Sequence, residues 1–355
     1  MAWPFFRKIS KKFLGIDIGT SAIKIVELSK TKEKVKLENY GEMIIRTLNE
    51  KPFRSFERST LLLSDQDVAE AINNILAKAQ IVTRDAFFSI PDFSTFFTFL
   101  ELPAMTQEEL SPAIQFEARQ HIPLPLSEVA LDWLIIEDKT LSKRKSKLDI
   151  LLVAVPHEVI NQYQAIAKLC HIQALSLEAE IFGLVRALIK NKKGIIGLVD
   201  IGAQSTTYNI VENGNLKTTH SFDISGNELT RVLSKSLNIG YNEAEELKKK
   251  YGVRNPEMPV GRVLTPFLDL LAGEIDKISR DFHKTEGKEI EKIILAGGLA
   301  LLPSLKEYLS NWLKKPIEIG NPFVDILYPP GLEEVLREMG PSYAITVGTA
   351  LRGFE

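Results

Sequence analysis

The chain has 355 residues with a formal net charge of −2, and 45% of its residues are hydrophobic and 25% charged. This length predicts about two to three domains, and the composition excludes extended disorder. The near-neutral charge excludes bulk nucleic-acid binding. The single Cys170 excludes an internal disulfide or a cysteine zinc cluster, as expected in a reducing cytoplasm. No apolar run approaches the roughly 20 residues of a membrane span.

The first twelve residues place three aromatic side chains (Trp3, Phe5 and Phe6) before four basic ones. A secretory signal needs an apolar core after its charges, so this order excludes one. The pattern favours an arm that packs its aromatic residues on the domain, and it leaves open a contact with a membrane surface.

Residues Phe13 to Leu28 form two apolar runs separated by Gly19, Thr20 and Ser21. This order predicts a strand, a tight turn and a second strand. Glycine lets the backbone turn without a Cβ atom, while consecutive amides and two hydroxyls offer hydrogen-bond donors to an anion. The turn therefore has the residue types of a phosphate-binding loop.

Two charged residues flank this turn. Lys24 adds a positive charge within reach of the same anion, and Asp17 ends the first strand. Because a carboxylate repels phosphate, the useful role of Asp17 would be to hold a hydrated Mg²⁺. For this motif alone, an ordinary hairpin with a solvated turn and a capping Asp17 stays an equal alternative.

The next elements alternate between strand and helix. A third strand is predicted from Lys34 to Ile45, and Arg46 to Thr60 is polar and irregular like a loop. Ser64 and Asp65 offer caps for a helix that continues through Ala79. The apolar run Ala86 to Ile90 then predicts a buried strand that Pro91 ends.

A compact insertion is predicted from about Ser94. Its elements are a strand Thr95–Leu102, a helix from the cap Thr106 to His121 with Glu109 at capping-box spacing, strands Val129–Glu137 and Leu148–Val155, and a helix His157–Cys170. The basic run Lys143–Lys147 is more typical of a solvated hairpin tip than of a binding patch. Residues Ala174–Ala187 then return as a strand end and a helix, with Glu178 and Glu180 at the junction.

The opening hairpin has a second copy. Residues Ile195 to Glu212 again form an apolar strand, an Asp-Ile-Gly sequence, a small polar turn and another strand. Asp200 follows Asp17 by 183 residues, and each has a glycine two positions on, Gly202 and Gly19. Two halves that each present an acid and a glycine-hydroxyl loop would grip one nucleotide from opposite sides.

The rest of the second half is mostly helical. Helices are predicted at Asn227–Leu237, Tyr241–Tyr251 and Thr265–His283, and a last one at Pro341–Ala350. Between them, Lys292–Leu305 is a buried-type strand that runs into Gly297 and Gly298 and then a helix start. Paired glycines let a backbone pass close to a ligand, and a helix N-terminus favours an anion.

Together these motifs resemble the actin-like ATPase superfamily. The matching loops are a phosphate-one loop (Asp17, Gly19, Thr20, Ser21, Lys24), a phosphate-two loop (Asp200, Gly202, Ala203, Gln204, Ser205, Thr206) and an adenosine loop (Gly297, Gly298, Leu299). The resemblance implies an α/β fold of two duplicated ribonuclease-H-like domains that flank a nucleotide cleft. It also implies ATP or ADP with Mg²⁺ held by Asp17 and Asp200 through water.

The insertion resembles that of FtsA and, more closely, of PilM proteins of type IV pilus machines. The implied domains are 1–93 and 174–194 (first domain), 94–173 (insertion), 195–226 and 287–340 (second domain), 227–286 (helical subdomain) and 341–355 (terminal helix). Two positions depart from the pattern: Ser304 stands where a second glycine is common, and Ala203 where many relatives have a hydroxyl residue.

The resemblance also implies roles for single residues. Glu178 matches the residue that orients the attacking water, although Glu180 nearby leaves helix capping open for either acid. Glu245 and Lys248 match a pair that lines adenine and ribose, and they equally fit a solvent-facing helical ion pair. The implied partner is the cytoplasmic N-terminal peptide of PilN, gripped between the first domain and the insertion, where the expected groove residues are Phe93, Phe96, Phe97 and Phe99.

The function implied is a cytoplasmic, ATP-binding adapter at the inner face of the inner membrane, which reaches the membrane through partners and links PilN to the assembly motor. The nucleotide state would modulate partner binding, and hydrolysis would be slow at most. Self-association stays possible. The alternatives are an FtsA-like polymerising ATPase and a small-molecule kinase of the same superfamily.

Overall fold

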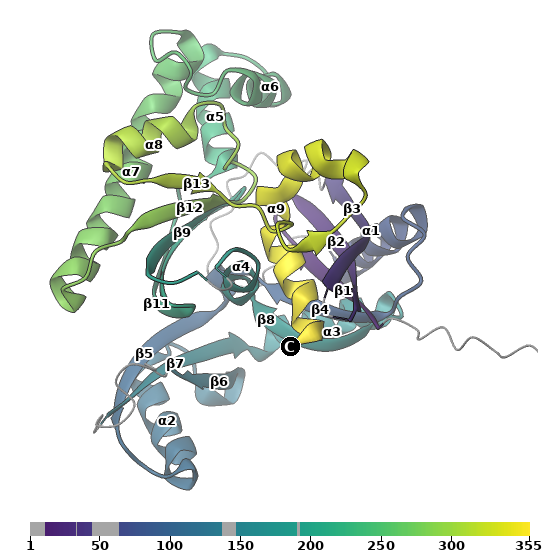
Figure 1. The fold of residues 1–355 in the computed structure, drawn as a ribbon, viewed down its shortest axis with the longest axis vertical. Coiled ribbons are helices and arrows are strands. Elements are labelled where there is room, and N and C mark those ends of the chain that lie inside the picture. Colours follow the sequence, from purple (N-terminus) through teal and green to yellow (C-terminus); the bar gives the residue numbers. More distant parts are fainter. Residues whose placement is uncertain (1–10, 33, 45–63, 137–146, 190–191) are drawn as a thin grey trace, which may run out of the picture.

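In the computed structural model, the described residues form three β-sheets, with six, five and three strands. Figure 1 shows the three-stranded sheet at the opposite end of the molecule from helices α5 (Gly226–Leu237) and α6 (Tyr241–Tyr251). The structure describes residues 11–355 except 33, 45–63, 137–146 and 190–191. The expected N-terminal arm up to residue 10, the expected loop Arg46–Thr60 and the basic residues 143–146 lie outside the described residues.

The first large sheet has the strand order β14-β3-β2-β1-β4-β8. Its strands are β1 (Lys12–Ile18), β2 (Ala22–Thr31), β3 (Lys34–Ile44), β4 (Asp85–Ile90), β8 (Gln173–Ala179) and β14 (Ile326–Leu327). Strands β1 to β3 form an antiparallel meander, while β4 pairs in parallel with both β1 and β8. The predicted opening hairpin is confirmed, and Asp17 lies opposite Lys24 in its register.

The second large sheet repeats the start of the first. Its order is β11-β10-β9-β12-β13, with strands β9 (Ile195–Ile201), β10 (Thr206–Glu212), β11 (Asn215–Phe222), β12 (Lys292–Ala296) and β13 (Ile317–Ile319). Strands β9 to β11 form the meander, and β12 pairs in parallel with β9. The carboxyl ends of β1, β9 and β12 therefore carry the loops that the sequence predicts to bind a nucleotide, and β4 and β8 end at the same edge as β1.

Helices cover both faces of the first sheet. Helices α1 (Asp65–Lys78) and α3 (His157–Leu169) pack in one core with the sheet. The predicted cap of α1 is confirmed, since the Ser64 hydroxyl accepts from the amide of Asp67. On the other face, α4 (Glu180–Leu188) and α9 (Glu333–Leu351) lie close together. A Cβ atom on Gly348 would meet the Gly183 carbonyl oxygen at 1.8 Å, so glycine permits this approach.

The insertion is a three-stranded sheet with one helix. It contains β5 (Phe96–Pro103), α2 (Gln107–His121), β6 (Val129–Ile135) and β7 (Lys147–Pro156) in the sheet order β5-β7-β6. The predicted capping box is present: Thr106 and Glu109 each accept from the other's backbone amide. Helix α2 packs on the sheet face that carries Phe96, Leu100 and Ile150. The predicted strand, helix and two strands are therefore confirmed, but the last predicted helix of the insertion, His157–Cys170, packs as α3 in the core of the first sheet.

Two long helices begin earlier than the sequence predicts. Helix α7 spans Pro259–Glu286, six residues longer at its start than predicted, because Pro259 occupies the first turn, where a proline needs no amide partner. Helix α9 begins at Glu333 and passes through Pro341, where the prediction placed its start. Pro341 is buried, and tertiary packing offsets the hydrogen bond that a proline removes.

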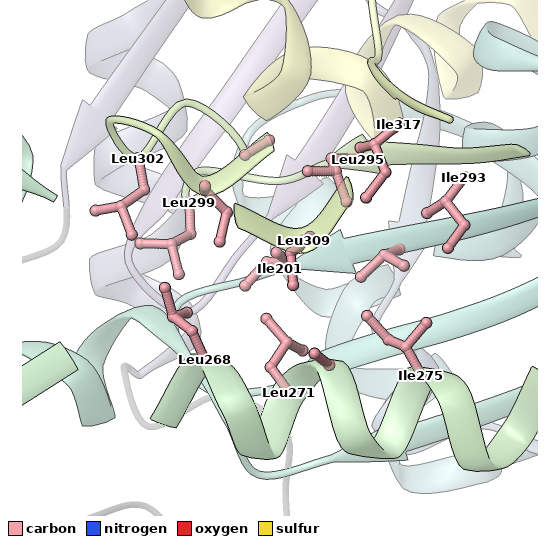
Figure 2. Packing of buried hydrophobic residues seen from close by; sticks show 14 of the residues in the cluster. Ile201, Leu268, Leu271, Ile275, Ile293, Leu295, Leu299, Leu302, Leu309 and Ile317 are labelled. Carbon is pink, nitrogen blue, oxygen red and sulfur yellow. The ribbon is translucent and has the colours of Figure 1, made fainter. Parts of the chain in front are cut away.

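The core of the second half lies between the second sheet and its helices. Figure 2 shows Leu268, Leu271 and Ile275 of α7 facing Ile201 of β9 and neighbouring residues. Helix α8 (Leu305–Leu313) closes the other side of this core with Leu309. None of the described helices combines the length and apolar character that a membrane span requires.

Candidate nucleotide site

The two hairpin turns are closed in the same way. In the first, the Gly19 amide donates to the Ala22 carbonyl at 3.1 Å, and in the second the Gly202 amide donates to the Ser205 carbonyl at 2.9 Å. Thr20, Gln204 and Ala203 are half-buried, and Ser21 is exposed. The structure therefore brings two equivalent turns to the carboxyl ends of β1 and β9, with polar groups accessible in both.

Asp17 and Asp200 lie at the ends of these strands and influence each other. Asp17 is only 4% exposed, and the Ser89 hydroxyl donates to its Oδ1 at 2.8 Å. Desolvation raises the pKa of Asp17, and it raises the pKa of Asp200 to about 6, with the Asp17 charge contributing. The sequence prediction that these two acids face one site is consistent with this electrostatic contact.

Lys24 is the cation that interacts with both aspartates. Its charge lowers the pKa of Asp17 and of Asp200, but the net shift of each stays upward. The Lys24 ammonium also lies 5.7 Å from the centre of the Tyr343 ring on α9. The lysine is therefore close enough to act on both acids, but its charge does not offset their desolvation.

Two further acids belong to this cluster, and the sequence analysis did not assign Asp92 to it. The Ile181 amide donates to Oδ1 of Asp92 at 3.2 Å, while the Asp92 amide donates to Oε2 of Glu180 at 3.2 Å. Desolvation raises the pKa of Asp92 to about 7, and the charge of Asp200 contributes. Desolvation and then the charges of Asp17, Asp92 and Asp200 raise the pKa of Glu180 well above its usual value.

A sequence signal for Asp92 exists. It lies two residues beyond β4, which pairs in parallel with β1, so its side chain belongs to the same sheet edge as Asp17. Acids that follow neighbouring parallel strands meet at their carboxyl ends. Recognising that Ala86–Ile90 pairs with the first strand would have predicted this position.

Glu178 lies elsewhere, which corrects its predicted role. Both of its carboxylate oxygens accept from Arg186, at 2.7 and 2.9 Å, and its side chain is 10% exposed. Arg186 also donates to the Gly348 carbonyl at 2.8 Å and to Glu355 at 2.8 Å. Glu178 thus forms a bidentate pair that joins β8 to α4, and Arg186 extends the link to α9. Glu180 is the junction acid on which the charges of the aspartates act.

The pair Glu245 and Lys248 is not the solvent-facing pair that one interpretation predicts. Lys248 is 3% exposed, and its ammonium donates to the Gly226 carbonyl at 2.8 Å and to the Thr230 hydroxyl at 2.6 Å. It also pairs with Glu245 at 2.6 Å. The Gly226 amide in turn donates to the Gly202 carbonyl at 3.0 Å. Lys248 therefore stabilises the second turn indirectly, through Gly226.

Two predicted contact residues turn their side chains into the protein. Thr206 is fully buried, and its hydroxyl donates to the Ile224 carbonyl. Leu299 packs in the core of the second half, where Figure 2 shows it beside Leu302. Their predicted ligand contacts are therefore corrected: only their backbone atoms remain for a ligand.

The paired glycines differ in what surrounds them. Gly297 has a positive φ of +86°, and a Cβ there would lie 2.4 Å from the Ile201 carbonyl oxygen and 2.6 Å from Oδ1 of Asp200. Its amide donates to the Pro341 carbonyl at 2.9 Å. Gly298 is exposed and has open space around its Cβ position. The loop therefore packs directly on Asp200 and leaves room outside Gly298.

The predicted groove phenylalanines divide between two faces of the insertion. Phe96 packs against the core under α2, which corrects its predicted place in a groove. Phe97 lies on the opposite face, 6.5 Å from the Phe182 ring of α4. Phe99 on that face is 38% exposed, and Phe93 is half-buried. Leu134, 53% exposed, lies across β7 from Phe99 in the sheet register.

The residues present fit a nucleotide with a hydrated divalent cation. Desolvation keeps the pKa values of Asp17 and Asp200 raised despite Lys24, so added positive charge would stabilise their ionised forms. Within the described ranges, no three acids, histidines or cysteines are arranged to bind a metal directly. A cation held through its water shell, as Mg²⁺ commonly is, suits this arrangement.

Comparison with known proteins extends over the whole fold. The family model described as "Type IV pilus assembly protein PilM" matches residues 15–354. The cell division protein FtsA of Staphylococcus epidermidis is 21% identical over 267 residues, which cover 68% of this chain and 54% of FtsA. The chain thus spans about half the length of that relative. The FtsA of Pseudomonas aeruginosa is 21% identical with 97% and 90% of the two chains covered.

Solved structures agree with this assignment. A structure described as a PilM-PilN type IV pilus biogenesis complex is similar with a TM-score of 0.84, 23% identity, and 96% and 98% of the two chains covered. MreB 5 of Spiroplasma citri bound to AMPPNP has a TM-score of 0.51, 13% identity, and 97% and 96% covered. The chain belongs to the PilM family of type IV pilus assembly proteins and has the actin-like ATPase fold.

Proposed function

We propose that this protein is an ATP-binding adapter of the type IV pilus assembly machine. The observation that carries the nucleotide part is the meeting of two equivalent turns with Asp17, Asp200 and Lys24 between them. An adapter of this kind would work in the cytoplasm, at the inner face of the inner membrane, and reach the membrane through its partners. Linkage to the assembly motor belongs to the same proposal.

The nucleotide would be held from both halves. Asp17 and Asp200 would bind the water shell of Mg²⁺, and the amides of the Gly19 and Gly202 turns would donate to phosphate oxygens. Thr20, Ser21, Gln204 and Ser205 would add polar contacts. Bound Mg²⁺ supplies charge neutralisation for the phosphates. Gly298, with open space outside it, would face adenosine. The Glu245–Lys248 pair would stabilise the neighbouring wall of the nucleotide site.

Glu180 is the acid best placed to orient a water molecule for hydrolysis. It interacts electrostatically with both metal-site aspartates, whereas Glu178 is engaged by Arg186. Desolvation and then the charges of the three aspartates raise the pKa of its carboxyl group well above that of a surface glutamate. We expect slow turnover in the absence of a partner, because among the described residues only Lys24 is proposed to bring a cationic side chain to the phosphates.

The partner would be the cytoplasmic N-terminal peptide of a PilN protein. The similar structure is described as a complex of PilM with PilN, and its fold match covers 96% of this chain. The surface that suits an apolar peptide is the face of the insertion with Phe97, Phe99 and Leu134. Phe93, half-buried in the turn that leads into β5, would extend it. Phe99 and Leu134 keep large apolar area exposed there.

Calorimetric titration tests this proposal directly. A synthetic peptide of the PilN N-terminus from the same organism is titrated into the protein with and without Mg-ATP. Saturable binding of both ligands is the expected result. Phe99→Ala should weaken peptide binding about tenfold, because an exposed aromatic anchor is lost. The matched control is Phe116→Ala, which removes an exposed phenylalanine of α2 and should change the affinity less than about twofold.

Other outcomes point to the alternatives. Mg-ATP binding with no peptide binding would overturn the pilus adapter. Pelleting that depends on protein concentration and ATP would then favour an FtsA-like filament, and phosphoryl transfer to a screened small molecule would favour a kinase.

A further inference from the structure

Asp92 lies where the chain leaves the first sheet for the insertion. Strand β4 ends at Ile90, and the 3-10 turn η1 (Asp92–Ser94) leads into β5 with only Pro91 and Thr95 on either side of it. The turn is closed by the Ser94 amide on the Pro91 carbonyl at 2.9 Å and by the Thr95 amide on the Asp92 carbonyl at 3.1 Å. A displacement of Asp92 would therefore be passed directly to the first strand of the insertion.

The same residue is fixed to the start of α4 by two reciprocal hydrogen bonds. Its carboxylate accepts from the Ile181 amide, and its own amide donates to the Glu180 carboxylate, each at 3.2 Å. Asp92 is only 6% exposed, so these bonds are shielded from water. The parallel register, which pairs Ile90 with Ala179, places the two strand ends side by side.

We call the two reciprocal hydrogen bonds between Asp92 and the start of α4 the clamp. Glu180 connects this clamp to the nucleotide cleft. Strands β1, β4 and β8 are adjacent and parallel, so Glu180, directly after β8, lies at the sheet edge that carries Asp17. The charges of Asp17 and Asp200, the acids proposed to hold the metal, act on its carboxylate. A change of charge in the cleft changes the forces on this carboxylate, and the carboxylate holds the amide of Asp92. Phe93 lies within the turn and Phe97 follows it in β5, and both belong to the proposed peptide surface.

We propose that Asp92 is a positioning residue that couples occupancy of the nucleotide cleft to peptide binding on the insertion, through its reciprocal hydrogen bonds with the start of α4. This inference rests on the proposed function, since it requires both ligands. It assigns the coupling to one clamp, whereas the proposed function requires only that both ligands bind.

Two substitutions separate the clamp from a merely structural role. Asp92→Ala leaves the Ile181 amide without its acceptor, so the turn keeps only the bond from its backbone amide to Glu180 and is no longer held from both sides. Asp92→Asn keeps an oxygen that accepts from this amide and should keep the clamp. Asp325→Ala is the control, because Asp325 is an exposed aspartate on a loop of the second half.

The experiment measures the dissociation constant of the PilN peptide with and without saturating Mg-ATP, by calorimetry, in wild type and the three variants. We expect the dissociation constants with and without Mg-ATP to differ about tenfold in wild type, Asp92→Asn and Asp325→Ala, and we call this factor the ratio. Asp92→Ala should bind each ligand alone within about threefold of wild type, with a ratio near one. A ratio near the wild-type value in Asp92→Ala, or a lost ratio in Asp92→Asn, would overturn the inference.

The wild type itself separates this inference from the proposed function. If it binds both ligands with a ratio of one, the coupling is absent and the adapter function stands. If it binds neither ligand, the proposed function fails and the inference fails with it.

Hydrogen exchange provides a second test that does not depend on how the variants fold. Adding Mg-ATP alone to the wild-type protein should change amide exchange in residues 91–97 severalfold, while α2 on the far side of the insertion should not respond. Unchanged exchange in residues 91–97 in the presence of bound nucleotide would contradict the proposed route.

Discussion

The two hairpins of this protein share a backbone and differ in chemistry. Both turns are closed by an amide-to-carbonyl bond from the glycine to the residue three positions on. The acid stands at the same place in both, Asp17 in β1 and Asp200 in β9. Opposite Asp17 the second strand carries Lys24, whereas opposite Asp200 it carries Thr207.

The surroundings of the two acids differ as well. Asp17 accepts a hydrogen bond from Ser89 of the neighbouring strand, while Asp200 is packed against the Gly297 loop. The first hairpin therefore supplies positive charge, and the second depends on a close backbone approach. A duplicated scaffold can thus keep its turn geometry while each copy takes a different part of one site.

The largest effect is expected where the second hairpin meets its glycine loop. Gly297→Ala would place a Cβ 2.4 Å from a backbone oxygen in a left-handed conformation. We expect a loss of about 3 kcal/mol in the free energy of unfolding, measured by urea denaturation. Gly298→Ala, with open space at its Cβ, should cost less than about 0.5 kcal/mol. Equal stability of the two variants would show that this close approach is not required.

The charge of Asp200 should make the metal-free protein less stable as pH rises. Its folded pKa of about 6 exceeds the usual 3.8, so the folded state binds more protons and stability falls between about pH 4 and 6. Asp200→Asn should therefore stabilise the protein by about 1–2 kcal/mol at pH 7.5 in EDTA and have little effect at pH 4. Thermal unfolding across this range measures it, and Asp325→Asn should show no such trend. A destabilised Asp200→Asn protein at pH 7.5 would reverse the sign and refute the argument.

The smallest effect is expected from making the first hairpin like the second. Lys24→Thr removes the charge opposite Asp17 and should weaken Mg-ATP binding about tenfold, because an anion loses one cationic contact. Lys34→Thr, at an exposed position of β3, should leave the affinity within about twofold. Fluorescence titration with a nucleotide analogue measures both constants. If the two lysine variants bind equally well, Lys24 does not contact the phosphates.

Much of the fold follows from local signals in the sequence. The two hairpins, the cap Ser64 and the capping box at Thr106 each depend on residues within a few positions of one another. The helix through Pro341 could not be predicted in the same way, since its stability comes from packing against distant strands. Local propensity favours a helix start at a proline, and tertiary contacts override it here.

The site was predictable to a similar degree. The turns and their acids come from a repeated pattern, and the structure brings Asp17, Asp200 and Lys24 together. The choice between Glu178 and Glu180 could not be predicted from the sequence. It depends on Arg186, eight residues after Glu178, and on which side of β8 faces the cleft. Asp92 required knowledge of the parallel pairing of β4 with β1.

The central claim is that one Mg-nucleotide lies between the two hairpins and needs an acid from each. Its most direct test is calorimetric titration of wild type, Asp17→Asn and Asp200→Asn with ATP, in Mg²⁺ and in EDTA, with Asp325→Asn as the control. The account predicts a single saturable site in wild type and in the control. The affinity for ATP should be at least about tenfold weaker in EDTA, and at least about tenfold weaker in Asp17→Asn and in Asp200→Asn. Wild-type affinity in both Asp17→Asn and Asp200→Asn would contradict it.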